Sequence, residues 1–141
     1  MVAPTPSGPL EALDRMRAAA IAQSAADMSQ VYAADAVHEF PFTRPGAPAR
    51  MEGRDTIIGF IAAFWDTSPL RYERYRTIAI HQTTDPGTIV VEQEVQGTSS
   101  TTGSFVLPNI MVLKARHGQI AHLRDYANLV AVEEAIGSAV S

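Results

Sequence analysis

The second half of the chain, from Leu70 onward, changes to a period of two, and this pattern limits the possible folds more than any other feature. Such alternation is typical of strands with one face on a core. The strands are expected over residues 72–82, 88–96 and 104–115, and a last one after Gly118 within the stretch that ends at Leu129. Between them lie Asp85-Pro86-Gly87, the 97–103 loop and His117-Gly118. Short turns join antiparallel neighbours, so the pattern predicts a mostly antiparallel sheet.

The first half of the chain has helical spacing. Apolar residues recur every three or four positions from Leu10 to about Ala26, and Asp27 is a candidate N-cap for a second helix over 28–33. A strand is expected over 36–42, a Pro/Gly-rich loop over 43–53, and a third helix capped by Asp55. A short helix over 130–136 should end at Gly137.

The element order predicts an α+β fold: a cone-shaped α+β barrel in which helices cover the concave face of a curved sheet. With 141 residues, the chain has the size of one domain. We place this domain at residues 10–137, between a flexible N-terminus (1–9) and a C-terminal tail (138–141). The run over 104–115 is apolar on both faces, which predicts a strand covered on each side.

Composition excludes several classes of protein. The chain has no cysteine, which excludes disulfides and thiolate zinc sites, and its net charge is −4. The only basic cluster is Arg71, Arg74 and Arg76, so we expect no nucleic-acid partner. Neither a signal peptide nor an apolar run of about 18 residues is present, which predicts a cytoplasmic protein without a membrane partner.

Asp125 is the main candidate for chemistry. Counted by two along the last strand, it shares a face with the apolar residues Ala121, Leu123 and Ala127. Two interpretations remain open: the carboxylate is held by backbone or by Arg124, or it faces a ligand cavity where a raised pKa serves proton transfer.

Other candidates lie on the same predicted surface. His38 is a possible acid/base partner, because a histidine titrates near neutral pH, although a lone histidine is also a common core residue. Gln93 and Asn109 are polar side chains in apolar strands that either bind a substrate or satisfy the sheet. We expect the pocket walls to include Tyr32, Phe40, Trp65 and Leu123. We predict no metal site and no cofactor, since the four histidines lack ligand spacing and there is no phosphate-binding glycine loop.

The sequence resembles the nuclear transport factor 2-like superfamily, in its SnoaL-like and ketosteroid-isomerase-like branch. The residues that carry the resemblance are Tyr32 to Val37, Phe40-Pro41, Gly53-Arg54-Asp55, and Gly118 through Tyr126. The resemblance implies a cone-shaped pocket and a fold that hosts isomerases, cyclases, epoxide hydrolases and binding modules.

The branches differ in their functional residues. The positions of the two ketosteroid isomerase acids fall at Phe40 and near Pro108, so that mechanism is not expected here. Limonene epoxide hydrolases have an Arg-Asp-Tyr motif like Arg124-Asp125-Tyr126, but their Arg-x-Asp pair falls at Gln93 and Val95. Phenazine-biosynthesis A/B-type proteins are similar at Asp85-Pro86, Gly97 and Asp125. Asp125 is the position that several branches share.

These observations lead to three functional hypotheses. The first is a cofactor-independent SnoaL-like cyclase or isomerase of secondary metabolism that uses acid/base proton transfer on a hydrophobic polyketide- or terpenoid-like substrate. The second is an epoxide hydrolase that activates water with Asp125, and the third is a non-catalytic ligand-binding module. We also expect a homodimer through the outer face of the sheet, where we place Tyr72, Ile80, Val90 and Val112.

Overall fold

The structure is a computed structural model that describes residues 8–137, so most of the predicted N-terminal segment and all of the predicted tail lie outside the described residues. The described elements, in chain order, are α1 (Pro9–Ala22), α2 (Ala25–Val31), β1 (Tyr32–Glu39), β2 (Arg50–Glu52), α3 (Arg54–Thr67), β3 (Leu70–Gln82), β4 (Thr88–Ser99), β5 (Gly103–Arg116), β6 (Gln119–Ala127) and α4 (Leu129–Ile136).

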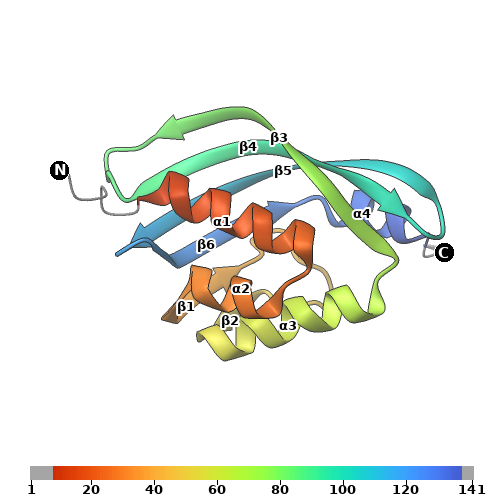
Figure 1. The fold of residues 1–141 in the computed structure, drawn as a ribbon, viewed down its shortest axis with the longest axis horizontal. Coiled ribbons are helices and arrows are strands. Elements are labelled where there is room, and N and C mark those ends of the chain that lie inside the picture. The colour runs from red at the N-terminus through yellow and green to blue at the C-terminus, as the bar shows by residue number, and fades with distance from the viewer. Residues whose placement is uncertain (1–7, 138–141) are drawn as a thin grey trace.

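One curved sheet organises the fold (Figure 1). Its strand order is β2-β1-β6-β5-β4-β3. Four consecutive strands, β3 to β6, pair antiparallel as the period of two predicts, and β1 joins them parallel to β6. The sheet stays open between its edge strands β2 and β3 instead of closing into a barrel. The predicted α+β class, with a curved and mostly antiparallel sheet, is confirmed.

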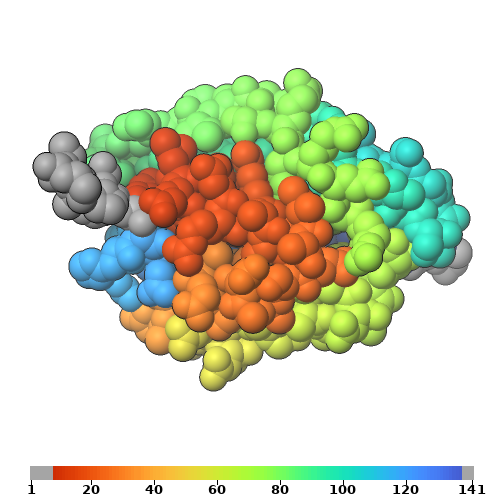
Figure 2. Space-filling model, in the orientation of Figure 1, coloured from red at the N-terminus to blue at the C-terminus, as the bar shows by residue number. Residues whose placement is uncertain are grey.

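The helices lie against the concave face of this sheet. α1 runs across β3, β4, β5 and β6, α3 packs on β1 and β2, and α4 contacts β5. In the space-filling view, α1 and α2 lie in front at the middle of the molecule, and parts of the strands remain visible above them and on both sides (Figure 2). No helix among residues 8–137 combines the length and apolar character needed to cross a bilayer.

Strand β4 illustrates how the sequence builds the core. Its burial alternates along the strand, and Ile89, Val91, Gln93 and Val95 are all buried on the helix side. Each aliphatic side chain buried in this way contributes about 1.5–3 kcal/mol. Gln93 is therefore a polar residue in the middle of a stabilising apolar row, which places it on the face where a ligand site can form.

The boundaries near the first two helices differ from the prediction. α1 ends at Ala22 because Gln23 adopts a left-handed conformation (φ 50°), and α2 follows at once. The N-cap of α2 is Ser24, whose Oγ accepts a 3.1 Å hydrogen bond from the backbone N–H of Asp27. Asp27 therefore lies in the first turn of α2 and is not its cap. Strand β1 begins at Tyr32, four residues earlier than predicted.

Three further predictions about local structure were wrong. Asp55 is not the N-cap of α3, because Gly53 occupies that position with φ 89°. Asp55 lies in the first turn, where its negative charge interacts favourably with the positive end of the helix dipole. Strand β5 is not covered on both sides, because Val106 and Ile110 on its outer face are 51% and 43% exposed. β2 lies in the segment that was predicted to be a loop.

Strands β3 and β4 approach each other closely at Gly97. A Cβ atom at Gly97 would lie 2.0 Å from the backbone oxygen of Arg71, so only glycine fits there. Opposite Gly97, the register of β3 shifts between Tyr72 and Arg74. Because of this bulge, both Tyr72 and Tyr75 line the cavity on the concave side. The placement of Tyr72 on the outer face was therefore wrong.

Candidate active site

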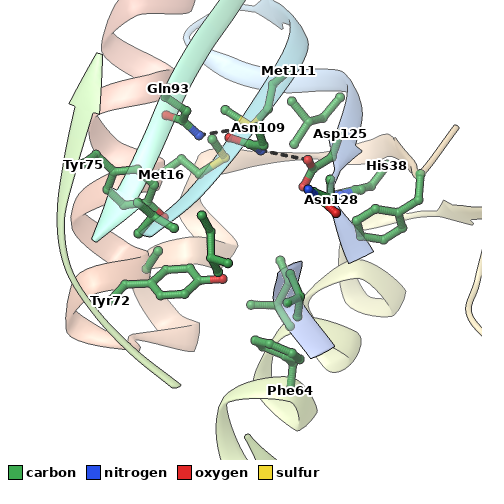
Figure 3. Close-up of a pocket in the computed structure, with 18 of the residues that line it drawn as sticks. Met16, His38, Phe64, Tyr72, Tyr75, Gln93, Asn109, Met111, Asp125 and Asn128 are labelled. Atoms are coloured by element: carbon green, nitrogen blue, oxygen red, sulfur yellow. Dashed lines mark hydrogen bonds between the residues drawn. The ribbon is translucent and has the colours of Figure 1, made fainter. Parts of the chain in front are cut away.

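A cavity of about 250 Å³ lies between the concave face of the sheet and the helices. Its walls are mostly apolar and aromatic, with Met16 from α1, Phe64 and Trp65 from α3, and Tyr72 and Tyr75 from β3. All eight residues that the sequence nominated as site residues line it, namely Tyr32, His38, Phe40, Trp65, Gln93, Asn109, Leu123 and Asp125. Figure 3 shows Gln93, Asn109, Asp125 and His38 along one side, with Tyr72 and Phe64 across from them.

Asp125 is the acidic residue of this cavity. It extends from β6, where its register partner on β5 is Met111. Burial among apolar side chains disfavours the charged form and raises the pKa of Asp125 to about 6, while a hydrogen bond from Asn109 acts in the opposite direction. The strand alternation directs Arg124 to the other face, level with Glu39 of β1. The carboxyl group therefore faces the cavity without the arginine next to it in sequence.

Asn109 is the hydrogen-bond donor to Asp125. Its Nδ2 lies 2.9 Å from Oδ1 of Asp125, from a position on β5 that is diagonal to Asp125 across the strand pair. Among residues 8–137, Oδ2 of Asp125 has no hydrogen-bond partner. A carboxylate with one oxygen fixed and the other directed into a cavity is arranged to exchange a proton with a bound molecule.

His38 is held by Tyr32 at the side of the cavity. The hydroxyl of Tyr32 lies 3.0 Å from Nδ1 of His38. Burial lowers the pKa of His38 to about 4 and raises the pKa of Tyr32, so both side chains are neutral at pH 7. Tyr32 then donates to Nδ1, and the proton of the ring lies on Nε2. This Nε2 is buried and has no partner among the described residues.

A row of polar side chains crosses the sheet at one register level. Thr77 on β3 faces Gln93 on β4, and Gln93 faces Asn109 on β5. Arg17 of α1 reaches this row from the helix layer, because its Nε and Nη2 donate to Oε1 of Gln93 at 3.0 and 2.8 Å. Arg17 was not among the predicted site residues, because the helical pattern does not indicate which strand the helix crosses.

Two tyrosines close the aromatic side of the cavity. Burial raises the pKa of Tyr72 to about 12 and raises that of Tyr75 as well, and the nearby charge of Asp125 adds to both shifts. Both hydroxyls therefore stay protonated at neutral pH and can donate a hydrogen bond. Within residues 8–137, no group of three or more His, Asp or Glu side chains is arranged to hold a metal ion.

The comparison with known sequences finds two relatives over most of the chain. The uncharacterized protein YesE of Bacillus subtilis is 27% identical over 128 residues, which cover 90% of this chain and 86% of that protein. The uncharacterized PhzA/B-like protein PA3332 of Pseudomonas aeruginosa is 32% identical over 104 residues, which cover 73% of this chain and 72% of that protein. The second relative agrees with the predicted resemblance to phenazine-biosynthesis A/B-type proteins.

Solved structures share the fold. A provisionally named isomerase from Bacillus subtilis superposes with a TM-score of 0.84 at 26% identity, covering 93% of this chain and 94% of that one. The Δ5-3-ketosteroid isomerase of Mycobacterium sp. has a TM-score of 0.70 at 21% identity, covering 89% and 96%. An epoxide hydrolase of the limonene type from Mycobacterium tuberculosis has a TM-score of 0.65 at 12% identity, covering 91% and 88%. At 21% and 12% identity, the ketosteroid isomerase and the epoxide hydrolase show only that the fold is shared.

The family model that matches this chain is that of the SnoaL-like domain, and the match covers residues 13–123. This range includes α1 from Leu13 onward, all strands but the end of β6, and the positions of His38, Gln93 and Asn109. The protein belongs to the SnoaL-like domain family.

Proposed function

We propose that the protein is a cofactor-independent isomerase or cyclase that transfers a proton within a small hydrophobic molecule, with Asp125 as the acid/base group. The observation that carries this proposal is the state of one carboxyl group. Asp125 lies in an apolar cavity, receives one hydrogen bond from Asn109, and has a pKa raised to about 6. A carboxyl group that titrates near neutral pH can both accept and return a proton during one turnover.

The proposed reaction balances without another reactant. At pH 7 about ten Asp125 side chains are ionised for each protonated one. The carboxylate removes a proton from a carbon next to a carbonyl, so a C–H bond breaks and an O–H bond forms, and the electron pair passes to the substrate as an enolate. The protonated Asp125 then gives the proton back at another carbon, or after the enolate has closed a ring.

The size of the cavity restricts the substrate. A volume of about 250 Å³ lies at the small end of ligand cavities, which are typically about 300–1,000 Å³. A molecule of one or two fused rings suits such a space. We therefore propose a polyketide- or terpenoid-like molecule of one or two rings as the substrate class.

Epoxide hydrolysis is the second candidate function. It is favoured by the Asn109–Asp125 pair, since an amide and a carboxylate together can hold and activate a water molecule. Against it, Gln93 and Val95 stand where the resemblance places an arginine and an aspartate, and both line the cavity here. Direct proton transfer to and from carbon needs neither an arginine nor a second acid at these positions, so it requires less of this site.

The test uses 2-tetralone, a bicyclic ketone with acidic C–H groups next to its carbonyl. The protein should accelerate exchange of these protons with D₂O above the buffer rate, followed by proton NMR. Asp125→Asn should lower the acceleration by ~10²–10⁴-fold because an amide does not carry the proton. Asp66→Asn, an exposed position on α3, is the matched control and should retain the parent rate.

Two results would contradict the proposal. Exchange no faster than in buffer, with 2-tetralone shown to bind, would indicate that the cavity has no acid/base function toward ketones. An Asp125→Asn protein that folds, binds 2-tetralone and exchanges the protons of this ketone at the parent rate would contradict the acid/base role of Asp125 and favour the binding-module hypothesis.

A further inference from the structure

Arg17 is anchored to the polar row by three hydrogen bonds. Nε and Nη2 donate to the single acceptor Oε1 of Gln93 at 3.0 and 2.8 Å, and Nη1 donates to Oγ1 of Thr77 at 2.9 Å. The guanidinium also lies over the ring of Tyr75, with its central carbon 5.4 Å from the ring centroid. Because guanidinium hydrogens point in fixed directions, this arrangement leaves Arg17 little freedom.

The hydrogen bonds from Arg17 fix the orientation of the Gln93 amide. An arginine only donates, so the atom of Gln93 that it contacts must be the carbonyl oxygen, and Nε2 must point the other way. Among residues 8–137, the one hydrogen-bond partner of Nε2 is Sδ of Met111, at 3.8 Å. Gln93 is 4% exposed, yet it lines the cavity. A thioether is a weak acceptor, so a buried NH₂ group that has this acceptor alone lacks a full hydrogen-bond partner.

We propose that Arg17 is a positioning residue that directs the Nε2–H of Gln93 into the cavity to bind a carbonyl oxygen of the substrate. The inference rests on the proposed function for the reaction, and it names the substrate class as ketones or esters with an acidic C–H group. Arg17 touches no ligand itself. It acts through Gln93, both by holding the amide in place and by polarising it, since Oε1 accepts two hydrogen bonds from a cation.

This assignment gives Asp125 and Gln93 different tasks. Asp125 removes the proton, and the negative charge that then develops on the carbonyl oxygen is stabilised by the Gln93 donor. The two groups extend from β6 and β4, which are separated by one strand and hence by ~10 Å between backbones. A molecule of one or two rings can contact both at once. In Figure 3, Gln93 lies at one end of the polar side and Asp125 further along it.

The test compares 2-tetralone with tetralin, which has the same two rings and no carbonyl. Gln93→Met keeps the length of the side chain and removes the donor, so it should weaken 2-tetralone binding on the order of tenfold while tetralin binding changes less than about twofold. The infrared C=O stretch of bound 2-tetralone should be lower in frequency in the parent protein than in Gln93→Met. Arg17→Lys keeps the positive charge but loses the two parallel N–H donors of the guanidinium group, so the C=O stretch should lie between those of the parent and Gln93→Met. Arg17→Met loses the charge as well, so its C=O stretch should lie closer to that of Gln93→Met.

The matched control is a second Arg–Gln pair, formed on the outer face of the sheet by Arg74 of β3 and Gln96 of β4. There Nε of Arg74 donates to Oε1 of Gln96 at 2.5 Å, outside the cavity, so Gln96→Met should leave the stretch and both affinities unchanged. An unchanged C=O stretch in Gln93→Met would overturn the role of Gln93. A stretch in both Arg17 variants equal to that of the parent would overturn the role of Arg17.

The binding result for Gln93→Met and the proton-exchange result for Asp125→Asn test the two proposals separately. If Asp125→Asn abolishes proton exchange while Gln93→Met leaves the affinity for 2-tetralone intact, the acid/base proposal stands and the carbonyl-binding inference fails. If Gln93→Met lowers ketone affinity but Asp125→Asn leaves exchange unchanged, the cavity binds carbonyl compounds without the proposed chemistry.

Discussion

Asn109 donates a 2.9 Å hydrogen bond from Nδ2 to Oδ1 of Asp125, so that the acid of the cavity is partly stabilised in its charged form. Two effects therefore oppose one another at Asp125. Burial raises its pKa and the Asn109 hydrogen bond lowers it, and burial is the larger of the two, which leaves the pKa at about 6. The balance between them sets the fraction of carboxylate at neutral pH.

The first prediction is that Asn109→Leu raises the pKa of Asp125 above about 6, because the variant keeps the burial and removes the hydrogen bond to the carboxylate. Carboxyl-carbon NMR over a pH series measures the change. Asp85 is an internal reference in the same spectra, since the backbone N–H of Gly87 and the hydroxyl of Thr88 lower its pKa. A parent midpoint for Asp125 at or below the ordinary aspartate value would refute the assigned environment.

The second prediction concerns the free energy of unfolding between pH 4 and 6.5. The folded-state pKa of Asp125 is raised from 3.8 to about 6, so its contribution to stability is fully present below pH 3.8 and is lost as the pH rises through 6. The loss amounts to about 3 kcal/mol by pH 7 at 1.36 kcal/mol per pKa unit. Asp125→Asn removes this loss, so its stability relative to the parent should increase with pH.

His38 should give the opposite sign over the same range. Burial lowers its folded-state pKa from 6.5 to about 4, so its contribution is present above pH 6.5 and is lost as the pH falls through 4. His38→Asn should therefore gain stability relative to the parent as the pH falls. Urea unfolding of both variants at pH 4, 5 and 6.5 measures these differences, and equal pH slopes for the two variants would contradict the assigned protonation states.

The third prediction concerns glycine at the edge of the sheet. Gly97→Ala should lower the free energy of unfolding by about 3 kcal/mol, because the new methyl group would collide with the backbone oxygen of Arg71. Gly59→Ala is the matched control: it lies in α3 with nothing within 4 Å of its added Cβ, and it should raise stability by about 0.5–1 kcal/mol. Urea unfolding should give opposite signs for the two variants, and a Gly97→Ala protein as stable as the parent would argue against the close approach of Arg71 to Gly97.

The fourth prediction is that the chain forms a homodimer through the outer face of the sheet. Val106 and Ile110 of β5 are 51% and 43% exposed there, next to the half-buried Val112. Light scattering should give a mass close to twice 15.2 kDa, and Ile110→Lys should return it to the monomer value. Ile21→Lys, at a 42% exposed position on α1, should remain dimeric. A parent protein that is monomeric at micromolar concentration would remove this proposal.

The sheet could be predicted from sequence because each strand carries its own periodic pattern. Asp125 and Gln93 were placed on apolar faces by counting in twos, and both line the cavity. The same counting failed at Tyr72, because the bulge before Arg74 shifts the register of β3 and no residue type announces it. β2 was missed because a three-residue strand is too short to show a period.

The contact between Arg17 and Gln93 could not be predicted at all. These residues are 76 positions apart, and their meeting depends on the angle at which α1 crosses the sheet. That angle follows from the packing of the buried face of α1, which includes Leu13 and Met16, on side chains from several strands at once. A periodic pattern identifies the buried face of a helix, but it does not say which strand lies beneath each turn.

The polar row that crosses the sheet at Thr77, Gln93 and Asn109 has a consequence for how such a protein can evolve. The row is one residue wide on each strand, and on β4 its neighbours are Val91 and Val95, which carry the packing. On β5 the same holds for Leu107 and Met111 on either side of Asn109. A single codon change within the row can therefore replace one polar group by another while the flanking core residues keep the strand in place, so that a descendant of this chain could acquire a new reaction one strand at a time.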